Sequence, residues 1–76
     1  MPLFHFNSQT GGVVLPDLEG EELPNVAVAR EVAEESARET LIEALKSGDT
    51  VPDCIQITDH EGHEVATISL DGLLHT

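Results

Sequence analysis

The stretch Pro16-Asp17-Leu18-Glu19-Gly20-Glu21-Glu22-Leu23-Pro24-Asn25 separates two unlike parts of the chain. Its Asp-Leu-Glu-Gly sequence has aspartate at the first and glycine at the fourth position, which is typical of a type I turn. Asn25 is a natural N-cap, because its side chain accepts hydrogen bonds from the free amides of a first helical turn. The segment therefore predicts a turn that leads into a helix, with strands before it and after the helix.

Two short strands are predicted before this segment. Phe4 and Phe6 alternate within residues 3–7, which is the period-two pattern of a strand. They are the only aromatic residues of the chain, and we expect them to anchor the core. Residues 13–15 form the second strand, and the polar, glycine-containing residues 8–12 predict a turn that pairs the two as a hairpin.

One long helix is predicted over about residues 25–47. An apolar stripe at helical spacing faces the core, and most of its members are small. The predicted stripe contains Val26, Ala29, Ala33, Ala37, Thr40, Leu41 and Ala44, with Leu45 at its edge. Gly48 is the expected left-handed residue that ends the helix. A face of alanines allows the helix to lie close to a sheet.

A second hairpin follows, with strands at residues 54–58 and 64–70 and a turn at Asp59-His60-Glu61-Gly62. We expect alternate apolar residues of both strands to share one face, with a bulge near Gly62. These residues are Ile55, Ile57, Ala66, Ile68 and Leu70. The predicted fold is α+β in the order β-β-α-β-β, with two hairpins in one antiparallel sheet against the helix. We expect residues 1–76 to form a single domain.

The charge is strongly acidic: fifteen acidic residues against three basic ones give a formal net charge of −12. Nucleic-acid binding requires clustered lysine and arginine, so we expect none. No apolar run approaches the ~20 residues that span a membrane. The single cysteine, Cys54, forms no intramolecular disulfide, and with no signal peptide expected it favours a cytoplasmic protein.

The sequence offers no catalytic constellation, and we expect no enzyme activity and no cofactor. Two histidines and two carboxylates lie within residues 59–63, where His60 and His63 are the candidate metal ligands. We favour a solvated hairpin tip, because its spacing matches no standard zinc pattern.

A candidate interaction surface combines apolar and acidic residues. Val28, Val32 and Ile42 lie off the predicted core stripe. A helix of about 21 residues spans roughly 31 Å, whereas a six-residue strand spans about 20 Å. Part of the helix should therefore extend beyond the sheet, and its exposed apolar residues favour self-association. The acidic members of this surface are Glu19, Glu21 and Glu22.

The order of these motifs resembles a family of small bacterial proteins that is described only as a domain of unknown function. Its members open with Met-Pro and an aromatic strand, as in residues 1–6 here, and continue with Asp-x-Glu-Gly-x-Glu-Leu-Pro, seen at residues 17–24. An alanine-rich helix follows, similar to residues 27–44, and then a strand, an Asp-x-x-Gly turn and a strand, as in residues 55–70. The resemblance implies no catalytic residues.

These observations favour a non-catalytic protein-interaction module that forms a homo-oligomer, most simply a homodimer. The alternative is an acidic inhibitor or nucleic-acid mimic that binds a basic protein surface. The two hypotheses differ in salt dependence, because salt screens charge–charge attraction and leaves apolar association intact.

The net charge of −12 predicts that salt stabilises the fold, since like charges repel one another in the compact state. Added sodium chloride shortens the screening length to about 10 Å at 0.1 M. We expect the thermal midpoint, followed by circular dichroism at constant pH, to rise between low and moderate salt. A midpoint that falls over this range contradicts the prediction.

Overall fold

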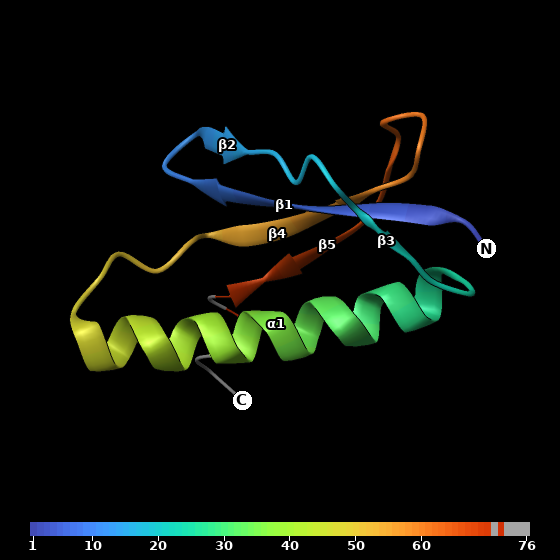
Figure 1. Cartoon of the computed structure of the whole chain (residues 1–76). Coiled ribbons are helices and arrows are strands. Elements are labelled where there is room, and N and C mark those ends of the chain that lie inside the picture. Colours follow the sequence, from blue (N-terminus) through green and yellow to red (C-terminus); the bar gives the residue numbers. More distant parts are fainter. Residues whose placement is uncertain (71, 73–76) are drawn as a thin grey trace.

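A computed structural model describes residues 1–70 and 72, and it confirms the α+β class. One helix lies against one face of an antiparallel sheet (Figure 1). The elements in chain order are β1 Leu3–Thr10, β2 Val13–Leu15, β3 Glu21–Glu22, α1 Val26–Ser47, β4 Cys54–Thr58 and β5 Glu64–Ser69. The predicted order holds, with the two-residue β3 added before the helix.

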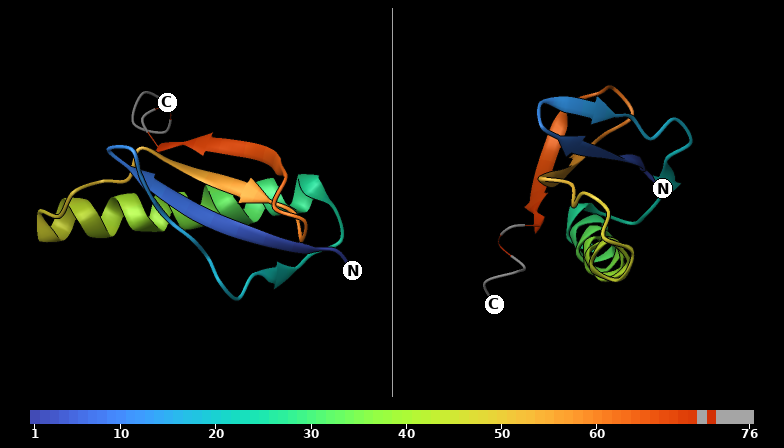
Figure 2. Two further views of the ribbon diagram at one scale, coloured as in Figure 1. Left: turned by 90° about the horizontal axis from the view of Figure 1, so that it is seen from above. Right: turned by 90° about the vertical axis from the view of Figure 1, so that its left-hand side faces the viewer.

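The sheet has the strand order β2-β1-β4-β5, and every neighbouring pair is antiparallel. The first strands of the two hairpins, β1 and β4, therefore pair at the centre of the sheet, and β2 and β5 lie outermost. β3 pairs with the start of β1, on the edge that β2 covers further along. Figure 2 shows the helix on one side of this twisted sheet and no helix on the other.

The first hairpin is tighter than expected. Gly11 and Gly12 alone connect the strands, with φ of 55° and 84°. Two consecutive positive φ values are typical of a type I′ turn, whose twist matches that of the flanking strands. The ladder consequently continues to Thr10, whereas the sequence pattern had predicted a strand end at Asn7.

The register of the second hairpin is the one that buries the most apolar surface. Ile57 pairs with Ala66, and Ile55 pairs with Ile68, so all four share the face toward the helix. A register shift follows Ile57, which leaves Val65 as an extra residue and supplies the predicted bulge.

Both predicted helix ends are confirmed. The Asn25 side chain accepts a hydrogen bond of 2.9 Å from the Val28 amide. Gly48 has φ 75°, and its amide donates to the Ala44 carbonyl at 2.8 Å. The cap and the glycine together define a helix of 22 residues.

The core lies between α1 and the strands β4 and β5. Ala29, Ala33 and Ala37 are fully buried, and Ile57 and Leu70 are the largest fully buried side chains. The alanines bring the helix axis close to the sheet, which leaves little room for larger residues. Phe4 is buried as predicted.

Three expectations about the core are wrong at its margins. Phe6 is only half-buried, because the helix packs over β4 and β5 rather than over the middle of β1. Val26 and Leu45 are exposed, since they lie in the first and last turns of α1. The last turns of the helix extend beyond the strands, as Figures 1 and 2 show.

The alanine stripe predicts a position-specific response to enlargement. Ala33→Leu adds three carbons where no space exists, and we expect it to lower the free energy of unfolding by about 1–3 kcal/mol. Ala27→Leu is the matched control on the exposed side of the same helix, with an expected effect within about 0.5 kcal/mol. Urea unfolding measures both, and equal effects would contradict this account of the core.

Candidate interaction site

The acidic segment, which comprises residues 16–25, is fastened to β1 through Asp17. The Asp17 carboxylate accepts hydrogen bonds from the amide of Phe6 at 3.1 Å and from the amide of Gly20 at 3.2 Å. The Asp17 amide donates to the Asn7 side chain at 2.8 Å. Asp17 thus provides a hydrogen-bond partner for the Phe6 amide, which lies between the part of β1 that pairs with β2 and the part that pairs with β3.

These contacts shift the ionisation of Asp17. Burial of the carboxyl group raises its pKa, but three backbone amides donate to the carboxylate and His5 lies nearby. The hydrogen bonds outweigh the desolvation, so the pKa of Asp17 lies below its ordinary value of 3.8. The negative charge of this residue therefore stabilises the fold.

Gly20 is required by close packing as well as by its backbone conformation. Its φ is 74°, and a Cβ atom there would lie 2.9 Å from the Phe4 carbonyl oxygen and 3.0 Å from the His5 ring. The His5 ring is itself held, because its Nδ1 lies 2.6 Å from the Asp17 carbonyl oxygen. The Asp-x-x-Gly pattern in this segment is thus explained by architecture.

The three glutamates of the candidate surface are exposed. Glu21 and Glu22 form β3 and pair with Phe4 and Leu3, and Glu19 lies in the turn that Asp17 closes. Their carboxylates contribute negative charge along one margin of the sheet.

The apolar part of the predicted surface needs correction. Val28 and Val32 are half-buried and pack against the core, because α1 buries a wider stripe than the sequence pattern suggested. Ile42 is 52% exposed. Leu45, three residues further along the helix, is 67% exposed, so an apolar patch does exist near the end of α1.

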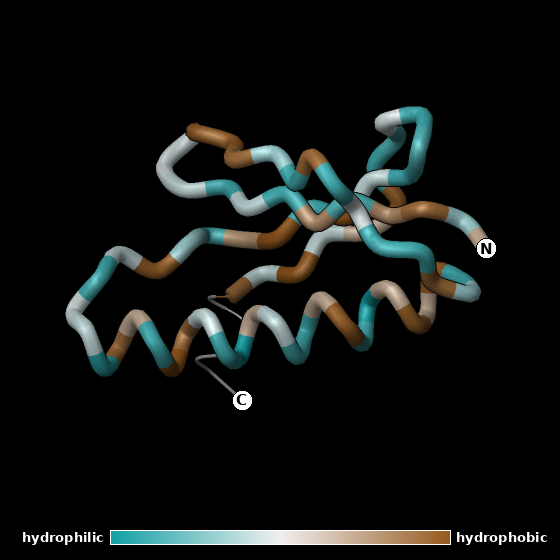
Figure 3. Tube along the Cα trace, viewed as in Figure 1, coloured by the Kyte–Doolittle hydropathy of each residue, from teal (hydrophilic) through white to brown (hydrophobic). Residues whose placement is uncertain are grey.

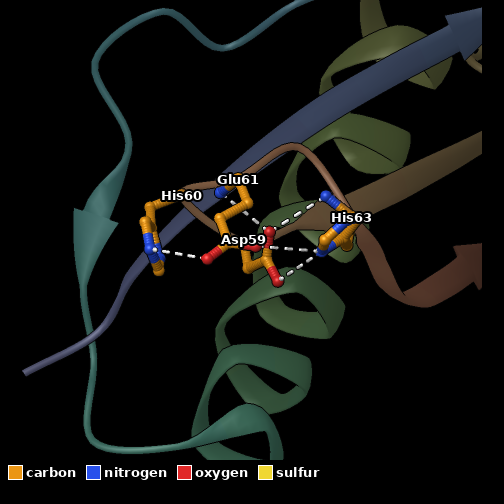
Figure 4. Close-up of polar contacts among 4 residues, drawn as sticks. All are labelled: Asp59, His60, Glu61 and His63. Carbon is orange, nitrogen blue, oxygen red and sulfur yellow. Dashed lines mark hydrogen bonds and ion pairs between the residues drawn. The ribbon is translucent and has the colours of Figure 1, made fainter.

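The hairpin tip brings both histidines close to carboxylates (Figure 4). His63 Nδ1 lies 3.6 Å from Asp59 and 3.5 Å from Glu61, and His60 Nε2 lies 3.5 Å from Glu61. The Asp59 carboxylate is occupied by the amides of His63 and Glu61, and these hydrogen bonds keep its pKa below the ordinary value. Among residues 1–70 and 72, no group of three or more potential ligands is placed to hold a metal ion.

A shallow open hollow of about 530 Å³ lies between the end of α1 and the loop to β4. Its lining residues are Thr40, Glu43, Ala44, Lys46, Ser47, Asp49, Thr50 and Pro52. This set contains neither histidine nor cysteine. Cys54 lies elsewhere, half-buried, with its Sγ 3.5 Å from the Gln9 side chain.

An exposed apolar edge is the surface that the sequence interpretation missed. Val13 and Leu15 are each 63% exposed and Val14 is 46% exposed, although all three belong to a strand. We call these three residues the β2 edge. Figure 3 shows it as an apolar segment at the edge of the sheet. Leu18, three residues further along the chain, is 86% exposed. The sequence predicted this strand, but only the strand order places it outermost.

Asp17 predicts a specific loss of stability. Asp17→Asn removes a charged acceptor from three amides, and we expect it to lower the free energy of unfolding by about 1–3 kcal/mol at pH 7. Because the folded-state pKa is depressed, this contribution is present above the unfolded value near 3.8 and is lost as the pH falls through the folded value. The difference from wild type should therefore shrink in acid.

Denaturant unfolding from pH 7 down to the acid limit measures this difference. Glu19→Gln is the control, since it removes a charge from the same turn at an exposed position. A difference between wild type and Asp17→Asn that stays constant with pH contradicts the role given to the carboxylate.

No helix within the described part of the chain is long and apolar enough to cross a membrane. Comparisons with known proteins place the sequence in one family: the model of the domain of unknown function DUF6894 matches residues 3–71. No curated protein and no solved structure gives a significant match. The family match covers β1 to β5, including the acidic segment, the helix and both hairpins. The chain therefore belongs to the DUF6894 family.

Proposed function

We propose that the protein is a non-catalytic interaction module that self-associates. The observation that carries this proposal is the exposure of large apolar side chains in two places, on the β2 edge and near the end of α1. The residues concerned are Val13, Val14 and Leu15 of the β2 edge, Leu18 three residues beyond it, and Ile42 and Leu45 of α1. Contiguous exposed apolar groups of this kind typically mark interaction sites.

The thin core supports the same conclusion. The helix contributes mainly alanines to the interior, and Ile57 and Leu70 are the largest fully buried side chains. Small domains often gain the stability that they lack from oligomerisation. Burial of exposed leucines and valines between two copies would supply apolar area that one copy cannot bury alone.

A second candidate function is an acidic inhibitor or nucleic-acid mimic for a basic protein. The outward side of α1 favours it, because exposed glutamates recur there at every fourth residue and form one row of negative charge. The exposed glutamates on this face are Glu31, Glu35, Glu39 and Glu43. For either function we propose the bacterial cytoplasm as the location, in line with a single unpaired cysteine.

Light scattering tests self-association directly. The monomer has a mass of 8.2 kDa, so we expect a species of about 16 kDa at concentrations of tens of micromolar. Apolar association should persist when salt is raised from about 0.1 M to 1 M, which shortens the screening length to about 3 Å.

A monomer at every concentration and at both salt levels contradicts self-association. Salt-sensitive capture of a basic protein by that monomer would then favour the acidic mimic, because only charge attraction is weakened by screening.

A further inference from the structure

The β2 edge lies in the uncharged part of a highly charged molecule. Residues 1–16 contain no aspartate, glutamate, lysine or arginine, and all fifteen acidic residues occur from Asp17 onward. A second copy of a chain with net charge −12 is repelled by most of its surface. The β2 edge itself adds no acidic side chain to such an approach, and the nearest carboxylate at its start, that of Asp53, is engaged by the Gly11 amide at 2.9 Å.

The backbone groups of Val14, at the middle of this edge, are free to pair. Asp53 donates its amide to the Gln9 carbonyl, so the backbone groups of Gln9 point toward β4 and away from β2. Gln9 is the partner of Val14 in the ladder. In antiparallel strands such a pair exchanges no hydrogen bonds, and the amide and carbonyl of Val14 therefore point outward from the sheet.

The opposite edge of the sheet differs in its chemistry. β5 begins with an exposed glutamate, Glu64, and contains the bulge at Val65. Charged residues and bulges are both features that protect edge strands from further pairing. β2 contains no charged residue and no bulge, and it carries three exposed apolar side chains in succession before Pro16 ends the strand.

We propose that two copies of the chain pair through their β2 strands, antiparallel and related by a two-fold axis at Val14. This inference rests on the self-association proposed above and assigns its interface and register. Val14 then lies opposite Val14 of the second copy, and Val13 lies opposite Leu15 of the second copy. The two sheets become one continuous sheet with β2 strands at its centre.

The side chains of the β2 edge suit this register. Val13 and Leu15 project from the same face of the strand, and α1 leaves them exposed because it packs over β4 and β5. The two-fold axis repeats the Val13–Leu15 contact on both sides of Val14, as an isologous interface requires. Valine and leucine are also favourable cross-strand neighbours, since their side chains cover one another.

Disulfide trapping tests the register. Paired residues that exchange hydrogen bonds have Cα atoms about 5.5 Å apart, within the range that a disulfide bridges. Val14→Cys in a Cys54→Ser background should form a covalent dimer under mild oxidation. The matched control is Val13→Cys in the same background. This cysteine lies opposite Leu15 of the second copy rather than opposite the second cysteine, so it should cross-link at least about tenfold more slowly.

A charge substitution tests the same interface without a cross-linking reaction. Val14→Asp places two carboxylates opposite each other, and we expect at least a tenfold weaker dimer by light scattering. Val14→Thr keeps a β-branched side chain and should retain the dimer. Proton–nitrogen spectra confirm that each variant remains folded, which is expected for a residue that is already 46% exposed.

The outcomes separate the two proposals. A wild-type dimer in which Val14→Cys cross-links no faster than Val13→Cys, and which tolerates Val14→Asp, overturns the β2 interface and leaves self-association standing. Faster trapping through Ile42→Cys would move the interface to the end of α1. A wild-type monomer in light scattering overturns both proposals.

Discussion

The hydrogen bond between the Asp17 carboxylate and the Phe6 amide is the contact on which the rest of the fold depends. It replaces strand pairing where the edge of β1 passes from β2 to β3. The same carboxylate closes the turn to Gly20, so one side chain fixes the first half of the acidic segment against the sheet. The β3 pairing and the hydrogen bond from the Leu23 amide to the Pro2 carbonyl then hold its second half, which leads to the helix cap at Asn25. A half-buried carboxylate is suited to this task because amide donors stabilise its charged form.

The sheet and the helix together explain why the molecule has an open edge. The alanine stripe holds α1 close to β4 and β5 but gives a narrow contact, and β2 lies outside it. On the other face of the two central strands, β1 and β4, the side chains are mostly polar, and Asn7 donates a buried hydrogen bond to Thr58. Polar side chains on that face can form hydrogen bonds with water, whereas the apolar side chains of the β2 edge are exposed to water without this compensation. The interaction proposed for this protein therefore uses the edge of the sheet rather than its face.

Much of the candidate site could not be predicted from local pattern. Glu19, Glu21 and Glu22 were expected to be exposed, and turn and strand geometry does expose them. Val28 and Val32 were expected on the surface, but a helix on a twisted sheet buries neighbours of its central stripe as well. β2, whose apolar side chains are all exposed, was predicted to be a strand, but the sequence pattern did not predict that it lies at an edge of the sheet.

The sequence alone determined the helix and its two ends, the four longer strands and the acidic turn, and it favoured the observed register of the second hairpin without excluding the other. Each of these depends on residues close together in the chain: a cap at Asn25, a left-handed glycine at Gly48, and period-two alternation in the strands. The tertiary structure alone decided that β1 pairs with β4, that Asp17 bridges the gap on β1, and that β2 is left at an edge. These features depend on contacts between distant residues, and local preference does not rank alternative strand orders.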